Sequence, residues 1–486
     1  MLFNSFAFAL FLPVVFALYW GVFRGLRARN LLLIAAGFLF YGWWDWRFLL
    51  LLLATSLTDY FVALAMGRTS DPARRKVLLG ISLAGNLGTL GVFKYFDFFS
   101  RSLADALHGL GFAHDPLLLH VVLPVGISFY TFQALSYTID VHRGRIAPVR
   151  EADTFLAFVS FFPQLCAGPI ERASHMLPQF QTPRLFSAQQ ATDGLRQMLW
   201  GFFKKIVIAD NCSRVVDEVF DASGSLPAPV LVLGAVLFAF QIYCDFGGYS
   251  DIAIGCARLF GFELMRNFAF PYFSRDIGEF WRRWHISLSS WFRDYLYIPL
   301  GGSRGGRGMA VRNTFIIFLV SGFWHGANWT FLAWGLLNAL YFLPLLLTGR
   351  NRANLDVVAE GRYWPTVSEL ARMLITFALA CIAWVFFRAA DIGQAFAYLG
   401  RMAGGLWHAE GRAGTLDFLR DHLGFMPAAA CLALLVLAEW WQRTRQHALQ
   451  DLAFARPLRW ALYIGLVLLI VFVGDHAEQQ FIYFQF

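Results

Sequence analysis

The chain has 486 residues, of which 58% are hydrophobic and only 15% are charged. Soluble proteins carry about 25% charged residues, so this composition excludes an ordinary soluble enzyme and predicts a polytopic membrane protein. The net charge of +8 arises in short loops between apolar runs, where membrane topology places arginine and lysine, so no nucleic-acid partner is expected. The six cysteines are scattered without metal-ligand spacing, and neither a disulfide framework nor a metal site is indicated.

The first apolar run, residues 6–23, is predicted to be a retained membrane span. No basic segment and no small-residue cleavage site marks it as a signal peptide. The first basic residue is Arg24, and Arg27 and Arg29 follow it closely. The excess of positive charge on cytoplasmic loops then predicts that the N-terminus lies outside and that the first loop is cytoplasmic.

The next apolar runs are each close to the ~20 residues that span a bilayer. They cover residues 31–44, 48–66, 77–93 and 117–139. The basic loops at 68–76 and 140–145 agree with the orientation set by the first span, and the acidic segment 94–116 is expected to face outward.

The regular pattern then breaks. Residues 154–170 contain two prolines and a glycine, which favours a broken or re-entrant helix buried in protein. Residues 194–210 combine apolar positions with lysines and are predicted to lie along the cytoplasmic interface. In the apolar run 229–262, Asp245 and Asp251 have two interpretations: polar groups that line a cavity, or a helix-breaking turn in which aspartate caps the next helix.

The C-terminal part contains a polar stretch and further apolar runs. Spans are predicted at 371–388, 427–441 and 458–474. Residues 391–425 are expected to form a loop or a short amphipathic helix, and residues 481–486 an interfacial tail. The sequence shows no internal repeat, so we predict one all-α membrane domain over 1–486 with roughly ten to twelve membrane helices.

Residues 278–338 contain two histidines surrounded by tryptophan and phenylalanine. Helical periodicity places His285 on the aromatic face of a predicted helix over 281–295. His325 lies well inside the apolar run 315–347, where an unpaired polar group costs several kcal/mol. A single buried histidine is commonly a hydrogen-bonded core residue, but two in one segment favour a chemical role.

The sequence around these histidines, FWRRWHISLS at 280–289 and FWHGANW at 323–329, resembles the membrane-bound O-acyltransferase (MBOAT) family. Within that family it is similar to the bacterial AlgI-like branch of alginate O-acetyltransferases. LPVGISFY at 123–130, FPQLCAGP at 162–169 and DFGGYSDIAIG at 245–255 extend the likeness. The resemblance covers residues 1 to about 345 and is weaker beyond.

The resemblance implies a helical membrane fold around a central funnel. His325 matches the active-site histidine of the family, and His285 matches a second polar position that is Asn, Asp or His in different branches. It also implies a cytoplasmic acetyl donor, most simply acetyl-CoA, without a tightly bound cofactor. A periplasmic partner of the SGNH-hydrolase type often completes the transfer onto a polysaccharide hydroxyl.

Acyl transfer from a thioester to a hydroxyl needs a base, and a histidine kept uncharged in a dry pocket suits that task. We therefore expect His325 to be the general base, and His285 to orient the donor or stabilise developing charge. Asn328, about one helical turn after His325, is expected on the same face, where it bonds the ring or the substrate or serves only as a packing amide.

Arg282 and Arg283 are expected near the cytoplasmic entrance, where they meet CoA phosphates or anchor the helix to anionic lipid. Trp324, Asp245 and Asp251 complete the set of expected substrate-binding residues. All of these residues fall within the motifs that carry the resemblance.

Two classes other than an enzyme are compatible with intramembrane histidines and broken helices: a transporter, and a scaffold that recruits a periplasmic transferase. Among enzymes, the acceptor is expected to be an extracellular polysaccharide such as alginate, with peptidoglycan, cellulose or another exopolysaccharide as alternatives. D-alanylation of teichoic acid is a further alternative, and it requires a carrier-protein donor instead of CoA.

Overall fold

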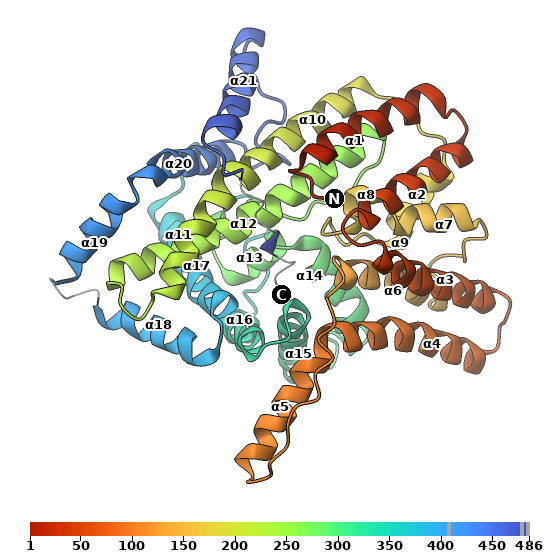
Figure 1. Cartoon of the computed structure of the whole chain (residues 1–486), viewed down its shortest axis with the longest axis horizontal. Coiled ribbons are helices and arrows are strands. Elements are labelled where there is room, and N and C mark those ends of the chain that lie inside the picture. Colours follow the sequence, from red (N-terminus) through yellow and green to blue (C-terminus); the bar gives the residue numbers. More distant parts are fainter. Residues whose placement is uncertain (406–409, 477–480, 483–486) are drawn as a thin grey trace. The chain divides into compact units, whose positions relative to one another are not determined.

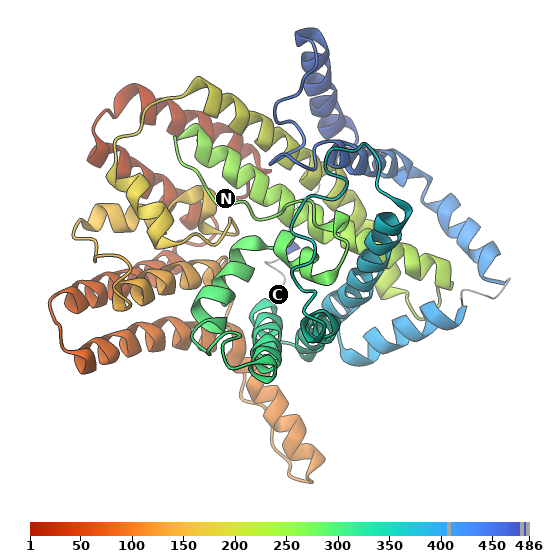
Figure 2. The same cartoon turned by 180° about the vertical axis from the view of Figure 1, so that it is seen from behind.

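The computed structural model describes residues 1–405, 410–476 and 481–482. Within these residues every regular element is a helix, which confirms the predicted all-α class (Figures 1 and 2). The chain divides into two compact units. Unit 1 comprises Met1–Gly194 and Ala253–Met265, and unit 2 comprises Leu195–Ile252 and Arg266–Phe486. The single domain expected for the whole chain stays a prediction.

Unit 1 contains the N-terminal helices and the start of α10. They are α1 (Phe6–Ala17), α2 (Leu26–Gly42), α3 (Arg47–Gly67), α4 (Pro72–Leu90), α5 (Phe96–Gly109), α6 (Ile127–His142), α7 (Ala152–Val159), α8 (Phe162–Leu165), α9 (Ala173–Gln181) and α10 (Ala188–Phe202). The short, buried α7 and α8 confirm the predicted broken helix over 154–170. Its re-entrant placement in a membrane stays a prediction.

A buried polar cluster joins α3, α4 and α6 in unit 1. The hydroxyl of Ser82 donates to Oδ1 of Asp59 at 2.6 Å, and Asn86 donates to Oδ2 at 2.8 Å. Ser82 also lies 2.9 Å from the hydroxyl of Thr138 on α6. A buried carboxyl group is costly unless it is hydrogen-bonded, so this cluster fixes the register of the three helices.

Unit 2 contains the remaining helices and both histidines of interest. They are α11 (Asp210–Asp221), α12 (Ala228–Leu259), α13 (Ile277–Arg283), α14 (Ile286–Phe292), α15 (Arg307–His325), α16 (Trp329–Leu347), α17 (Val367–Arg388), α18 (Ile392–Gly405), α19 (Glu410–Asp421), α20 (Met426–Trp441) and α21 (Arg456–Phe472). Helices α18 and α19 occupy the segment expected as a loop or short helix, apart from residues 406–409, which lie outside the described part.

Helices α15 and α16 form a tightly packed pair, visible side by side in Figures 1 and 2. Two glycines allow this contact. A Cβ atom on Gly322 would lie 2.2 Å from the carbonyl oxygen of Phe331, and one on Gly335 would lie 2.4 Å from that of Phe318. Small residues at a membrane helix interface let the two backbones approach closely. The contact lies one turn before His325 and holds the end of α15 in place.

Six described helical segments are long and apolar enough to cross a membrane. They are Arg47–Gly67, Pro72–Gly109, Ala228–Leu259, Trp329–Leu347, Val367–Arg388 and Leu423–Trp441. This finding supports a multi-pass membrane protein. The predicted total of ten to twelve membrane helices stays a prediction.

Two placements expected at the membrane interface are wrong. Lys204 and Lys205 are buried in a π-helical continuation of α10 (Phe203–Ala209), because carboxylates within unit 2 neutralise them. In the expected interfacial tail, Phe481 and Ile482 are also buried, and the backbone N–H of Ile482 donates to Asp245 at 2.7 Å. Residues 483–486 of that tail lie outside the described residues.

We predict that Gly322→Ala destabilises the protein, because the new methyl group meets a backbone carbonyl of α16. Overpacking of this kind costs about 1–3 kcal/mol, so the apparent melting temperature of the purified protein in detergent should fall. Gly308→Ala is the matched control, since Gly308 lies in the same helix with nothing within 4 Å of an added Cβ. Equal melting temperatures for the two variants would show that the helices are not in close contact at Gly322.

Candidate active site

The predicted continuous helix over 281–295 is wrong, because the chain turns sharply at His285. Helix α13 ends at Arg283 and α14 starts at Ile286, and His285 between them has φ 43° and ψ 56°. This left-handed conformation costs roughly 1–2 kcal/mol for a residue with a side chain, so contacts around it must hold it. The carbonyl of Asn267 provides one such contact, since it accepts the N–H of Ile286 at 2.9 Å.

His325 also lies in a different place from the one predicted. It is the last residue of α15 and not an interior residue of one long apolar segment, because Gly326 continues in extended conformation. The ring nitrogen Nδ1 of His325 lies 2.6 Å from the carbonyl oxygen of Ser321. A carbonyl only accepts, so Nδ1 carries the hydrogen, and in the neutral ring Nε2 holds the lone pair.

The fold brings the two histidines together. Their ring centroids are 6.4 Å apart, and the residues are 1% and 3% exposed, respectively. Trp324 lies against both rings, with centroid distances of 6.0 Å to His285 and 5.0 Å to His325. Trp334 and Phe387 contact His325 as well, at 4.9 Å and 5.5 Å. The fold therefore places both histidines in one buried aromatic site.

Burial sets the electrostatics of this pair. Removal from water disfavours a charged imidazole, and it lowers the pKa of His285 well below its usual value, with His325 as a second, smaller cause. Phe246 packs on the His285 ring with a centroid distance of 4.6 Å. The uncharged ring of His285 keeps a lone pair on one of its nitrogens.

Asn328 does not share a helical face with His325, contrary to the prediction. The helix ends before it, and Asn328 is the N-cap of α16, where its Oδ1 accepts the N–H of Thr330 at 3.1 Å. Its Nδ2 donates to the carbonyl of Ala390 at 2.9 Å. These contacts are those of a helix cap. A role for Asn328 in binding substrate stays a prediction.

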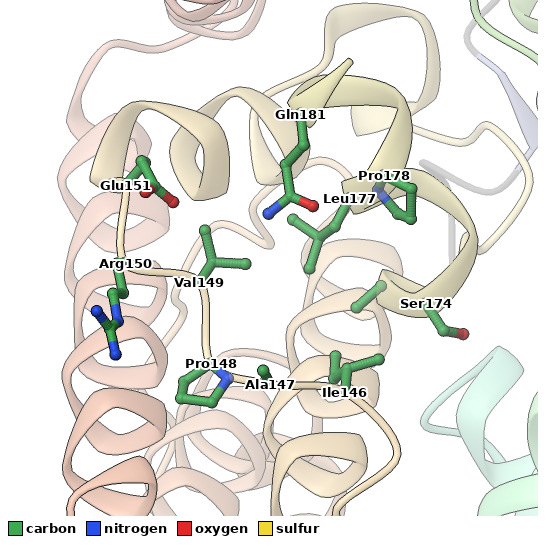
Figure 3. Close-up of a pocket in the computed structure, with 11 residues that line it drawn as sticks. Ile146, Ala147, Pro148, Val149, Arg150, Glu151, Ser174, Leu177, Pro178 and Gln181 are labelled. Carbon is green, nitrogen blue, oxygen red and sulfur yellow. The ribbon is translucent and has the colours of Figure 1, made fainter.

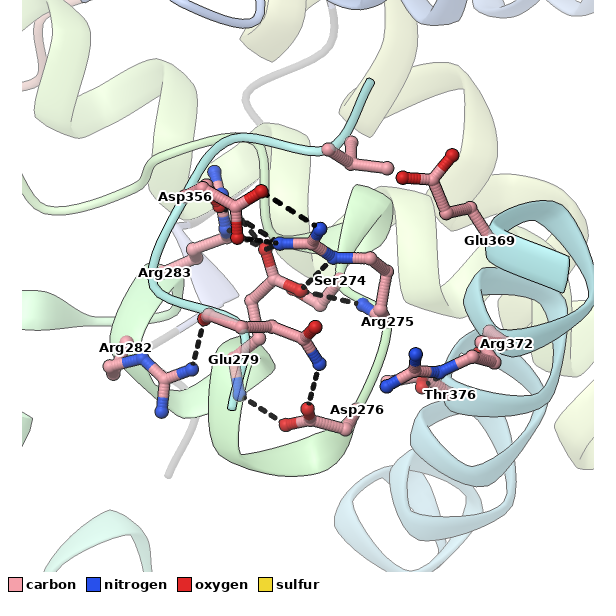
Figure 4. A network of polar contacts seen from close by, with 12 residues as sticks. Ser274, Arg275, Asp276, Glu279, Arg282, Arg283, Asp356, Glu369, Arg372 and Thr376 are labelled. Atoms are coloured by element: carbon pink, nitrogen blue, oxygen red, sulfur yellow. Dashed lines mark hydrogen bonds and ion pairs between the residues drawn. The ribbon is translucent and has the colours of Figure 1, made fainter. Parts of the chain in front are cut away.

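Arg282 and Arg283 hold α13 to the loop that follows α16 (Figure 4). The two terminal nitrogens of Arg282 donate to the carbonyls of Asn351 and Asn354, at 2.7 and 2.6 Å. Arg283 pairs with Glu279 at 2.9 Å. These contacts give both arginines a structural function, and their expected contacts with CoA phosphates or lipid stay predictions.

Asp245 and Asp251 lie in the uninterrupted helix α12, so the interpretation as a helix-breaking turn is wrong. Each carboxylate binds a buried lysine: Asp245 contacts Nζ of Lys205 at 2.7 Å, and Asp251 contacts Nζ of Lys204 at 3.0 Å. Burial alone would lower the pKa of Lys205, but Asp245 and a second carboxylate, that of Asp210, raise it. Substrate binding by the two aspartates stays a prediction.

Sequence reasoning missed the partners of these groups. Glu439 lies 3.8 Å from Nζ of Lys204 and accepts a hydrogen bond from Tyr243 at 2.8 Å. Asn267 contacts His285. The one available signal was the charge of Lys204 and Lys205 inside an apolar run, which requires carboxylate partners if the lysines are buried.

A pocket of about 340 Å³ lies in unit 1, between the loop after α6 and helix α9 (Figure 3). Its polar lining residues include Arg150, Glu151, Ser174 and Gln181. None of the predicted site residues lines it. Among the described residues no group of three His, Cys, Asp or Glu side chains is arranged to hold a metal ion.

Comparison with known proteins identifies the family of this chain. Residues 152–386, which include both histidines, match the MBOAT, membrane-bound O-acyltransferase family. The chain is 40% identical to a probable alginate O-acetylase AlgI of Pseudomonas syringae pv. tomato, over 84% of this chain and 75% of the relative. It is 39% identical to a probable alginate O-acetylase AlgI of Pseudomonas aeruginosa, over 90% and 81%.

A peptidoglycan O-acetyltransferase of Helicobacter pylori is 34% identical, over 100% of this chain and 98% of the relative. Such identities over most of both chains, together with the helical membrane fold, identify the protein as an acyltransferase of the membrane. The chain belongs to the membrane-bound O-acyltransferase (MBOAT) family.

Proposed function

We propose that this enzyme takes acetyl groups from a cytoplasmic thioester, most simply acetyl-CoA, for O-acetylation of a polysaccharide outside the inner membrane, with His325 as the general base. The observation that carries the proposal is the state of the His325 ring. Its Nδ1–H is committed to the carbonyl of Ser321, so a lone pair remains on Nε2 within a buried aromatic site. A base for a hydroxyl proton needs such a nitrogen.

The proposed step balances without a further reagent. Nε2 of His325 takes the proton of the acceptor hydroxyl as the oxygen attacks the thioester carbonyl. The tetrahedral intermediate then collapses, the carbon–sulfur bond breaks, and the thiolate receives the proton from the imidazolium. The apolar surroundings strengthen the electrostatic interactions that act on this transient charge. General-base catalysis of this kind contributes about 10²–10⁴-fold in rate.

Alginate is the acceptor that the comparisons favour. The relatives named as alginate O-acetylases are 39–40% identical, against 34% for the peptidoglycan O-acetyltransferase. Peptidoglycan is the second candidate, because that relative matches along almost its whole length. A periplasmic partner of the SGNH type that completes the transfer is part of this proposal, and it rests on the family resemblance.

The proposed orientation has a periplasmic N-terminus, since the basic loops alternate with acidic or neutral ones along the first spans. The loop between α3 and α4 would then be cytoplasmic and the segment after α5 periplasmic. This orientation gives the enzyme access to a cytoplasmic donor on one side and an external polymer on the other.

We predict that His325→Ala lowers the acetate bound to the polymer by at least about 10²-fold, because the hydroxyl proton loses its acceptor. The measurement is polymer-bound acetate in a deletion strain complemented with either protein, at membrane levels matched by immunoblot. His422→Ala is the control, since His422 is a half-buried histidine in α19's flanking turn that pairs with Glu218.

Near-normal acetylation by His325→Ala would contradict the base assignment and favour a scaffold. A transporter instead predicts movement of labelled acetyl groups across the membrane that does not depend on His325. Isolated membranes could transfer the acyl group from a D-alanyl carrier protein and not from acetyl-CoA. That result would show that the proposed donor is wrong, while the acyltransferase activity would stand.

A second prediction concerns the orientation. All six native cysteines are buried thiols, so an introduced exposed cysteine should dominate labelling by a membrane-impermeant maleimide. Ser70→Cys, in the exposed loop between α3 and α4, should react in inverted inner-membrane vesicles and not in intact spheroplasts. Asp115→Cys, exposed after α5, should show the opposite pattern. A reversed pair of results would place the N-terminus in the cytoplasm.

A further inference from the structure

Asn267 is a completely buried residue, 0% exposed, in the extended segment between α12 and α13. Its side-chain amide joins two parts of unit 2. Nδ2 donates to the hydroxyl of Ser250 on α12 at 3.1 Å, while Oδ1 faces the turn that carries His285. A buried amide with both ends bonded is held in one orientation. Asn267 therefore offers a fixed oxygen to the turn between α13 and α14.

Ser287 identifies which end of the amide faces this turn. Its backbone N–H can only donate and lies 3.4 Å from Oδ1 of Asn267, and its hydroxyl donates to the same oxygen at 3.0 Å. A reversed amide would place its own N–H groups against the backbone N–H of Ser287. The atom at this position is therefore an acceptor.

The ring of His285 must then donate to Asn267. Nδ1 of His285 lies 3.1 Å from Oδ1 and carries the hydrogen, so in the neutral ring the lone pair is on Nε2. The titratable side chain that faces His285 within the described residues is His325, on the end of α15. The other rings against it are aromatic, those of Phe246, Phe268 and Trp324. This surrounding opposes protonation of the imidazole.

We propose that Asn267 is a positioning residue that fixes His285 as a hydrogen-bond acceptor at Nε2. In this state His285 accepts a hydrogen bond from an N–H group of the acyl donor, and it does not donate a hydrogen bond to the oxyanion. This inference rests on the proposed function. Two roles were expected for His285: orientation of the donor and stabilisation of developing charge. A neutral Nε2 without hydrogen cannot stabilise negative charge, so orientation of the donor is the role that remains. Acetyl-CoA and acyl carrier proteins share a suitable group, the pantetheine amide N–H two methylenes from the thioester sulfur.

The test is Asn267→Asp, which replaces the neutral amide with a carboxylate of the same shape. An ionised carboxylate beside Nδ1–H favours the imidazolium, which raises the pKa of His285. The protonated ring cannot accept a hydrogen bond. The KM for acetyl-CoA should therefore rise as the pH falls, and this rise should begin at a higher pH than in the wild type, while kcat changes less. Initial rates with purified enzyme in nanodiscs between pH 5 and pH 9 measure this shift.

Asn313→Asp is the matched control, because Asn313 is also 0% exposed and bonds to the carbonyls of Leu300 and Gly302 instead of to a histidine. Its KM should keep the pH dependence of the wild type. An equal shift of the pH dependence of KM in both variants would overturn the inference. So would an Asn267→Asp enzyme whose kcat rises near neutral pH, because a charged His285 would then stabilise the oxyanion.

The wild-type protein gives a second test that needs neither the variant nor turnover. Nitrogen NMR of protein labelled with ¹⁵N-histidine distinguishes a ring nitrogen that carries hydrogen from one that holds a lone pair. The His285 signals, assigned by their loss in His285→Asn, should show hydrogen on Nδ1 and none on Nε2. The opposite tautomer would overturn the inference, whatever the result of the His325→Ala experiment on the proposed function.

Discussion

The structure around the two histidines depends on one constraint: a buried imidazole must place its N–H group on an acceptor. His325 meets it within its own helix, through the carbonyl of Ser321, and His285 meets it through the side chain of Asn267. An unsatisfied polar group in an apolar interior costs several kcal/mol, a large part of the stability of a folded domain. The two bonds therefore determine which nitrogen of each ring holds the lone pair.

Unit 2 also contains a buried network of ionic groups. Lys204 and Lys205 are each matched with carboxylates, and the carboxylates come from helices distant in the chain, such as α12 and α20. Removal of one member of a buried ion pair is far more costly than replacement of both, so these contacts restrict how the helices pack.

The sequence predicted the helical class and the membrane character, and it drew attention to the two histidines that the fold brings together. It did not predict the turn at His285 or the helix end at His325. Helical periodicity records which residues share a face, and it is unaffected by a hydrogen bond from Asn267, a residue 18 positions earlier. The prediction that Lys204 and Lys205 lie at the membrane interface failed for a similar reason. Cations in an apolar run are typical of an interface unless partners such as Glu439, far along the chain, neutralise them.

The left-handed backbone at His285 also limits which amino acids can occupy that position. Apart from glycine, asparagine, aspartate and histidine adopt this conformation most readily, since their side chains form local hydrogen bonds. These are the three residues that the family resemblance implies at this position. The backbone at this position thus favours these side chains independently of their chemistry, and alanine at residue 285 would alter the turn as well as remove the ring.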